Sequence, residues 1–225
     1  MSDSNYGVWN ADSPNGIPLA DTEHSNFQFL GVRSAFRFGE RVDSAPSAMI
    51  VDDSDNLDYR FLIEKSQHLV LMMNHGYTWT SIHREELRRR FEDPSKKTVF
   101  FLIDPDSRHL DTLALKGATT VESLRDKIIG TVRIILEIVG ESGIEMLGHG
   151  LYNPHSMILT ETVAVTIPYY TGRGVRTVPA SIFSSGHPFY RELGRDAEIL
   201  RVDSIPLLLK TSGTKPRFVH SLCQK

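Results

Sequence analysis

Polar side chains that can act as acids, bases or nucleophiles stand at the ends of several apolar segments of this sequence. Each segment is short and bounded by turn residues, which is typical of a buried strand. The side chains at these ends are Asn74, His75, Asp104, His149, Asn153 and His155. In open α/β sheets, ligands bind at the carboxyl ends of the strands. If these segments are neighbouring strands with aligned ends, the side chains share one cleft.

Each histidine, considered alone, is explained well enough as a surface residue or a hydrogen-bonded structural residue. Considered as a group, the histidines predict an anion site. An unperturbed histidine titrates near pH 6.5. Attraction of a phosphate-like anion should therefore strengthen as the pH falls from about 8 to about 6.

Two other kinds of site are less well supported by the spacing of these residues. A metal site would need a compact ligand pattern such as His-x-x-x-His, and the sequence contains none. The segment "FFLIDPDS" places Asp104 and Asp106 directly after an apolar run and resembles the haloacid dehalogenase nucleophile motif. However, no acidic pair follows a later segment to hold Mg²⁺. We interpret "DPDS" as a turn in which Asp104 binds backbone amides, and we expect no metal and no cofactor.

Composition restricts the classes of protein to which the chain can belong. The chain has 225 residues, of which 40% are hydrophobic and 24% are charged, and a formal net charge of -3. This balance gives no whole-protein argument for binding nucleic acid or an anionic membrane. The single Cys223 excludes an intramolecular disulfide. No apolar run approaches the roughly 20 residues that span a bilayer, and the N-terminus lacks the features of a signal peptide, so a cytoplasmic protein is expected.

The sequence predicts one folded domain between two tails. Residues 1–25 are rich in Asn, Asp, Ser, Pro and Gly, which predicts a mobile N-terminal arm. Residues 26–205 predict a single α/β domain, and residues 206–225 predict a C-terminal tail.

Apolar patterns within the domain predict the elements that must position the polar residues. The predicted strands lie within 26–42 and at 47–52, 68–74, 97–104, 144–149, 155–161, 163–169 and 178–184. The predicted helices lie at 56–67, 80–93, 120–139 and 188–201. The helix at 120–139 should be the main buried helix, with Thr119 and Glu122 as its capping box. This order of elements predicts an α/β fold in which a mixed sheet is flanked by helices.

Residues from about 60 to 200 resemble a phospholipase D superfamily domain of the divergent, stand-alone kind. The resemblance rests on "HLVLMMNHGYTW", "TVFFLIDPDS", a long helix, "HSMILTETVAV" and "YYTGRGVRTVPASIF" in that order. It implies a phospholipase-D-like fold in which one histidine attacks phosphorus and a second histidine protonates the leaving group. It also implies that a lysine stabilises the phosphate charge. Because the second histidine comes from a repeat or from another subunit, the resemblance implies a homodimer.

The motif residues can be transferred to this sequence one at a time. His155 matches the motif histidine, Met157 occupies the lysine position and Thr162 occupies the acidic position. A methionine thioether offers neither a positive charge nor a hydrogen-bond donor to a phosphoryl oxygen. Arg173 or Arg176 in "TGRGVR" would be able to replace the lost charge, although the same segment also reads as a solvated hairpin turn.

These observations predict a phospholipase-D-like domain with altered or lost phosphodiesterase activity. The domain would bind a phosphorylated small molecule or a nucleotide in a regulatory role. The candidate catalytic residues are His155 and His149. The candidate binding residues are His75, Asn74, Asp104, Asn153, Thr162, Arg173 and Arg176. The alternative is an active phosphodiesterase or nuclease that uses His155 with Arg173 or Arg176, and binding of nucleic acid is left open.

A basic helix face is a second place where phosphate contacts could arise. Its members are Arg84, Arg88, Arg89 and Arg90, with Lys96 and Lys97 beyond the helix. The Glu85–Arg89 and Glu86–Arg90 spacings favour a different interpretation, a solvated helix stabilised by pairs of opposite charge.

Overall fold

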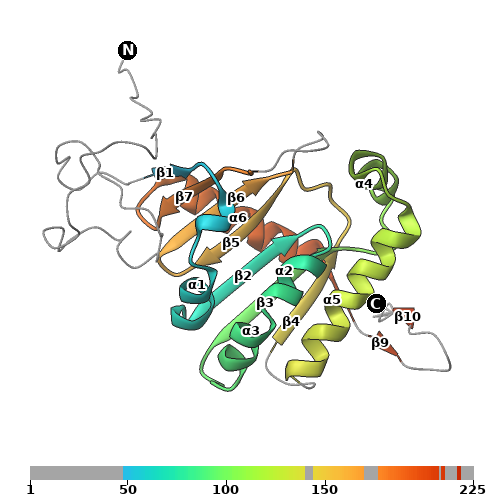
Figure 1. The fold of residues 1–225 in the computed structure, drawn as a ribbon, viewed down its shortest axis with the longest axis horizontal. Helices are drawn as coiled ribbons and strands as arrows, with labels where there is room; N and C mark the ends of the chain where they lie inside the picture. Colours follow the sequence, from blue (N-terminus) through green and yellow to red (C-terminus); the bar gives the residue numbers. More distant parts are fainter. Residues whose placement is uncertain (1–47, 140–143, 170–176, 208, 211–216, 219–225) are drawn as a thin grey trace, which may run out of the picture.

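The computed structural model describes residues 48–139, 144–169, 177–207, 209–210 and 217–218. The predicted arm at 1–25 and the strands predicted within 26–42 lie outside the described residues. The described chain forms a mixed sheet of eight strands in the order β1-β7-β6-β5-β2-β3-β4-β8 (Figure 1). The strands are β1 (Ala48–Val51), β2 (His68–Met73), β3 (Lys97–Ile103), β4 (Ile144–His149), β5 (His155–Thr160), β6 (Val163–Pro168), β7 (Ala180–Ser184) and β8 (Ile205–Pro206). The strands predicted from 47 onward are all present, and the predicted fold class is confirmed.

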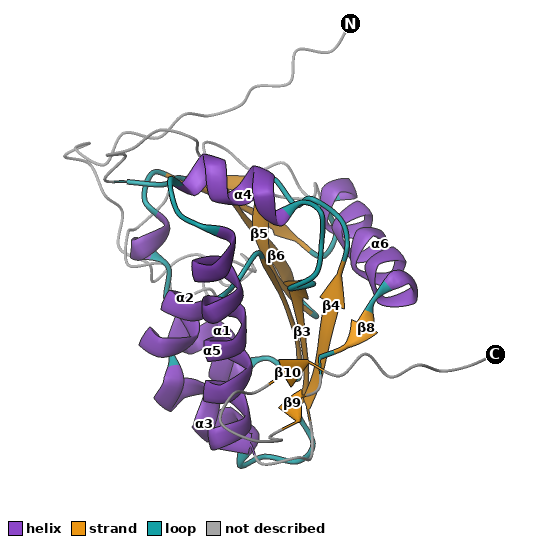
Figure 2. Ribbon diagram, turned by 90° about the vertical axis from the view of Figure 1, so that its right-hand side faces the viewer, coloured by secondary structure: helices purple, strands orange, loops and turns teal. Residues whose placement is uncertain are grey.

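Helices cover both faces of this sheet. They are α1 (Tyr59–Lys65), α2 (Tyr77–Ile82), α3 (Arg84–Phe91), α4 (Leu110–Gly117), α5 (Val121–Val139) and α6 (Pro188–Asp203). Figure 2 shows α1, α2, α3 and α5 against one face and α6 alone against the other. A short hairpin of β9 (Leu209–Lys210) and β10 (Arg217–Phe218) stands apart from the main sheet.

The central strands β2 and β3 carry continuous apolar runs after a polar start, because both faces of the sheet are covered there. In β3, every residue from Phe100 to Ile103 is buried, which explains the continuous run "VFFLI". Strands β2, β3 and β4 are parallel, and β5 runs antiparallel to β2. The carboxyl ends of three strands and the start of β5 therefore meet at one edge of the sheet.

Helix α5 is the main buried helix, as predicted. Its buried stripe is Leu124, Ile128, Thr131, Val132 and Ile135, at spacings of one turn or less. The predicted capping box is wrong by one residue. Thr120 is the cap, since its Oγ1 accepts a hydrogen bond from the Ser123 amide at 3.1 Å.

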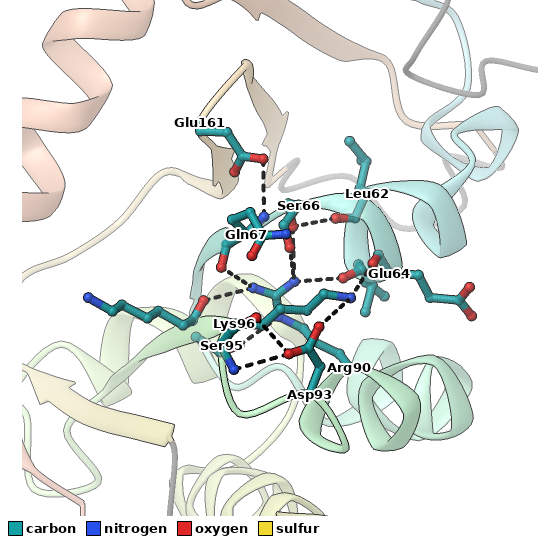
Figure 3. Close-up of polar contacts among 12 residues, drawn as sticks. Leu62, Glu64, Ser66, Gln67, Arg90, Asp93, Ser95, Lys96 and Glu161 are labelled. Carbon is teal, nitrogen blue, oxygen red and sulfur yellow. Dashed lines mark hydrogen bonds and ion pairs between the residues drawn. The ribbon is translucent and has the colours of Figure 1, made fainter.

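The helix predicted at 80–93 is in fact two helices. Helix α2 ends at Ile82, and α3 begins at Arg84 after a break at His83. Arg90 was expected on the exposed face, but its side chain is completely buried. Its guanidinium donates hydrogen bonds to backbone carbonyls at the end of α1 and at the start of β3 (Figure 3).

The domain extends slightly beyond the predicted boundary at residue 205. Strand β8 pairs with β4 through Leu147 and Pro206, and the next residue, Leu207, is 3% exposed within the hydrophobic core. These residues were assigned to the tail because a two-residue strand has no periodicity to detect. Helix α4 was also missed, since only eight residues carry its pattern.

Candidate functional site

The predicted alignment of strand ends is present in the structure. The antiparallel register pairs Met72 with Met157, and continuing it places Asn74 beside His155. The Ile103 amide donates a hydrogen bond to the Asn74 carbonyl at 3.1 Å. On the next strand, the Asp104 amide donates to the His149 carbonyl at 2.8 Å. The backbones of the predicted site residues therefore form one row across β5, β2, β3 and β4.

Their side chains do not all enter one cleft, because the row is divided between the two faces of the sheet. Met157 packs in the hydrophobic cluster that includes Leu193 and Leu200 of α6. His155 precedes Met157 by two residues and so points to the same face, where Asp196 of α6 acts on its charge. By the same alternation Asn74, two residues after Met72 of that cluster, points to the same face as His155, although it also borders the pocket beneath α4 and α5. His75, two residues after Met73 of the other cluster, points to the opposite face and lines that pocket. His75 and His155 therefore do not share one cleft, whereas His149, two residues after Leu147 of the α6-face cluster, points to the same face as His155.

Several side chains of this row carry buried polar atoms without a hydrogen-bond partner among the described residues. These atoms are Asn74 Oδ1, Asn153 Nδ2, His155 Nε2 and both ring nitrogens of His149. The Leu151 backbone lies close enough to His149 to favour its protonated form, but not in full hydrogen-bond geometry. A buried polar group left without any partner costs about 1–3 kcal/mol, so these atoms are places where ordered water or a ligand would bind.

Burial keeps the histidines neutral. Desolvation lowers the pKa of His149 to about 4, against a smaller opposing effect of the Leu151 backbone. Desolvation and the positive charge of Lys127 lower the pKa of His75 to about 4. Burial also lowers the pKa of His155, although Asp196 opposes the shift. The prediction that these histidines attract an anion more strongly between pH 8 and pH 6 is therefore wrong for His75 and His149.

The pocket at the end of β2 carries charge that the sequence analysis did not assign to the site. Its volume is about 170 Å³. The polar part of its lining comprises Asn74, His75, Lys116, Thr119, Lys127, Tyr152 and Tyr169. The apolar part comprises Ile103, Leu110, Leu113, Leu124 and Ile128, together with Gly117. None of its described lining residues is acidic, so the pocket is a positively charged concavity with an apolar wall.

The two lysines were missed for different reasons. Lys116 lies at the end of α4, a helix that was not predicted, and its ammonium contacts the Tyr152 hydroxyl and lies 4.8 Å from the centre of that ring. Lys127 lies on α5, where the amphipathic pattern identifies the buried stripe but not what the flanks face. Lys127 follows the buried Leu124 by three residues, and this place at the border of the buried stripe was the available signal.

Asp104 forms the turn that was predicted. Its Oδ1 accepts a hydrogen bond from the Asp106 amide at 2.9 Å, and its carbonyl accepts from the Ser107 amide at 2.8 Å. This geometry supports the interpretation of "DPDS" as a turn. Across the described ranges, no group of three His, Cys, Asp or Glu side chains is placed to hold a metal ion.

Thr162 does not belong to the site. It is exposed in the turn between β5 and β6, beyond Thr160 at the opposite end of the strand from His155. Five steps along a strand span about 17 Å. Thr162 lies beside the neighbouring Glu161, whose carboxylate accepts hydrogen bonds from the amides of Gln67 and His68. Arg173 and Arg176 lie outside the described residues.

The predicted basic face on α3 is occupied by ion pairs. Arg84 binds Glu137 at 2.9 Å, and Arg89 binds Glu64 at 2.7 Å. Arg88 binds Glu85 at 3.3 Å. Together with the burial of Arg90, these contacts favour the interpretation of α3 as a salt-bridged helix and not as a phosphate-binding face.

The comparisons with known proteins concern the fold alone. No protein-family model and no curated protein matches this chain. The structure is similar to Nuc, a phospholipase D family member from Salmonella typhimurium, with 8% identity and a TM-score of 0.48 over 72% of this chain and 98% of that chain. It is also similar to TrmBL2, an archaeal chromatin protein described as having a novel mode of DNA binding, with 9% identity and a TM-score of 0.45 over 70% of this chain. The chain spans about half of TrmBL2, 52% of which is covered.

No helix in the described part of the chain is long and apolar enough to cross a membrane. The protein has an α/β fold with a mixed sheet flanked by helices, and a phospholipase D family member is among the structures that it resembles.

Proposed function

We propose that this protein binds a phosphorylated small molecule or nucleotide at the carboxyl edge of its sheet, in a regulatory role, and that it does not hydrolyse generic phosphodiesters. The observation that carries the proposal is the environment of the candidate nucleophile. Met157, at the position of the expected lysine, is fully buried among apolar side chains. The charged group that acts on His155 is the carboxylate of Asp196.

This environment opposes phosphoryl transfer. Negative charge develops on the phosphoryl oxygens in the transition state, and an active site places positive groups or donors against it. A thioether supplies neither, and the charged group that acts on His155 is a carboxylate, which adds no positive charge. Loss of one such donor costs about 2.7–4 kcal/mol of transition-state stabilisation, or roughly 100- to 1,000-fold in rate.

The same edge keeps features that suit binding. The pocket at the end of β2 is lined by Lys116, by Lys127 and by the neutral ring of His75, on which the charge of Lys127 acts. Asn74 Oδ1 and Asn153 Nδ2 are buried without partners among the described residues, so both are free to bind a ligand or ordered water. A binding site needs hydrogen-bond donors in a cavity that matches the ligand, and these groups supply the donors. Binding does not require a nucleophile or a positive group to activate it.

Two measurements on the wild-type protein test the proposal. Release of p-nitrophenolate from bis-p-nitrophenyl phosphate should not exceed the buffer blank. Calorimetric titration with inorganic phosphate and with a nucleoside monophosphate should show saturable binding of at least one. Turnover that His155→Ala abolishes would restore the enzyme interpretation, and absence of binding by every phosphate compound would remove the binding interpretation.

The homodimer implied by the phospholipase D resemblance is part of this proposal. Light scattering on the full chain tests it directly. A mass of about twice that of the chain supports the dimer, and a monomer at the concentrations used for binding contradicts it.

A further inference from the structure

The pocket between β2, α4 and α5 has the charge and size of a site for a small anion. We propose that it binds the phosphate group of a small phosphomonoester with a short apolar portion, held by Lys116 and Lys127, and that a nucleotide is too large for it. This inference rests on the proposed function and specifies where the ligand lies and to which class it belongs. Helix α5, which lines the pocket, lies on the opposite face of the sheet from α6 (Figure 2), and His155 points to the α6 face.

Positive charge in the pocket lining comes from two helices, α4 and α5. Lys116 is at the end of α4, and its ammonium is held against Tyr152 by a contact with the phenol oxygen and with the ring face. Lys127 is half-buried on α5 and lies close enough to His75 to lower the pKa of that ring. No acidic residue is among the described lining residues, so no carboxylate of the lining competes for the ammonium groups of Lys116 and Lys127.

The neutral ring of His75 supplies a further donor. Its Nδ1 accepts a hydrogen bond from the Tyr77 amide at 3.3 Å. A neutral imidazole whose Nδ1 accepts must carry its hydrogen on Nε2, which makes Nε2 a donor. The backbone here is fixed as well, since Thr131 Oγ1 donates to the His75 carbonyl at 2.6 Å. Gly76 turns the chain with a positive φ of 65°, a conformation that favours glycine.

The opposite wall of the pocket is apolar. It therefore favours a ligand that has an apolar group attached to its phosphate. Ile103, Leu113 and Ile128 are buried side chains that line it. An inorganic anion alone would leave this wall without contact, whereas a short aliphatic or hydroxyalkyl group would cover it. The ligand that matches the whole pocket therefore has a charged head and a small, mostly apolar body.

The cavity is too small to enclose a ligand as large as a nucleotide. Pockets that enclose drug-sized molecules have volumes of roughly 300–1,000 Å³. This pocket has about 170 Å³, clearly less than the lower bound. A nucleoside monophosphate placed with its phosphate between the lysines would leave its base and most of its ribose outside the cavity. We therefore expect the ribose and base to add little affinity.

Calorimetric titration with ethyl phosphate and with AMP tests this inference. Ethyl phosphate should bind the wild type, and AMP should bind no more tightly. Lys127→Gln and Lys116→Gln should each weaken ethyl phosphate binding about 10- to 100-fold, the loss of one charge-assisted contact. Lys127→Arg should retain most of the affinity, and thermal denaturation should show that all variants fold. The matched control is Lys97→Gln, since Lys97 is exposed at the start of β3, away from the pocket.

Each result discriminates between the two proposals. If ethyl phosphate binds equally well to both glutamine variants but not to His155→Gln, the ligand lies on the α6 face; the proposed function then stands, and this inference is overturned. Binding of AMP at least tenfold tighter than ethyl phosphate overturns the size argument. If no phosphate compound binds the wild type, the proposed function itself fails.

Discussion

Replacing Arg90 by Met should destabilise the protein more than replacing any of the exposed arginines of α3 by Met. The Arg90 guanidinium is completely buried and donates to the carbonyls of Ile63 and Ser66 at 2.8 and 2.6 Å (Figure 3). It also donates to Thr98 Oγ1 at 2.7 Å and to the carbonyls of Gln67 and Lys97. This one side chain ties the end of α1 and the start of β2 to the start of β3.

The magnitude follows from the acceptors that the substitution would leave behind. The carbonyls of Ile63 and Ser66 are in buried hydrogen bonds, and each would lose its donor at a cost of about 1–3 kcal/mol. The Gln67 and Lys97 carbonyls are partly accessible, so water can replace most of their bonds. Methionine fills much of the space of the aliphatic stem, which limits the packing loss. We expect a loss of about 3–5 kcal/mol, at the upper end for a single substitution.

Urea denaturation followed by circular dichroism measures this loss. The matched control is Arg89→Met, one residue earlier on α3, whose ion pair with Glu64 is half-exposed and should contribute less than about 1 kcal/mol. Arg90→Lys should fall between the two, because an ammonium has three donors where the guanidinium has five. A loss below about 1 kcal/mol for Arg90→Met, with an unchanged m-value, would refute the assignment of Arg90 as the link between these elements.

Three further predictions address the core and the site. Ile135→Asp places a charge on the buried stripe of α5 and should prevent soluble expression; cooperative unfolding of a soluble variant would contradict the packing of α5. Because burial lowers the pKa of His149 to about 4, the unfolded state binds a proton first, so this group alone should lower the free energy of unfolding by roughly 3 kcal/mol as the pH drops from above 6.5 to 4. His149→Gln should remove this part of the dependence and leave the part that His75 contributes, since burial lowers the pKa of His75 to the same value. Met157→Lys should cost at least about 2 kcal/mol without creating phosphodiesterase activity, whereas Met157→Leu should cost less than about 1.5 kcal/mol.

The sheet was predictable because its central strands are buried on both faces. Burial of this kind requires a continuous apolar run, and "HLVLMM" and "KTVFFLI" both show it. The long helix was predictable for the related reason that Leu124, Ile128 and Ile135 repeat at the period of a helix facing a core. The polar residues at the strand ends were predictable as a row, since parallel strands end at the same edge.

The division of that row between two faces was not predictable. Which face a strand-end side chain takes depends on the last residue of regular pairing, and a shift of one residue reverses it. Arg90 was placed on the surface because its spacing from Glu86 matches an exposed pair, and local spacing does not reveal a ring of distant carbonyls. Lys116 was missed because its role depends on a tertiary contact with Tyr152, thirty-six residues away in the chain.

A ³¹P NMR experiment on one sample tests the central claim most directly, because it reports binding and cleavage together. The sample would contain the wild-type protein with ethyl phosphate and bis-p-nitrophenyl phosphate. We predict that the ethyl phosphate resonance broadens or shifts, that Lys127→Gln removes the effect, and that the diester signal keeps its full intensity. Loss of the diester signal at a rate that His155→Ala abolishes, or an ethyl phosphate resonance unaffected by the wild-type protein, would contradict the account of a site that binds phosphate without cleaving it.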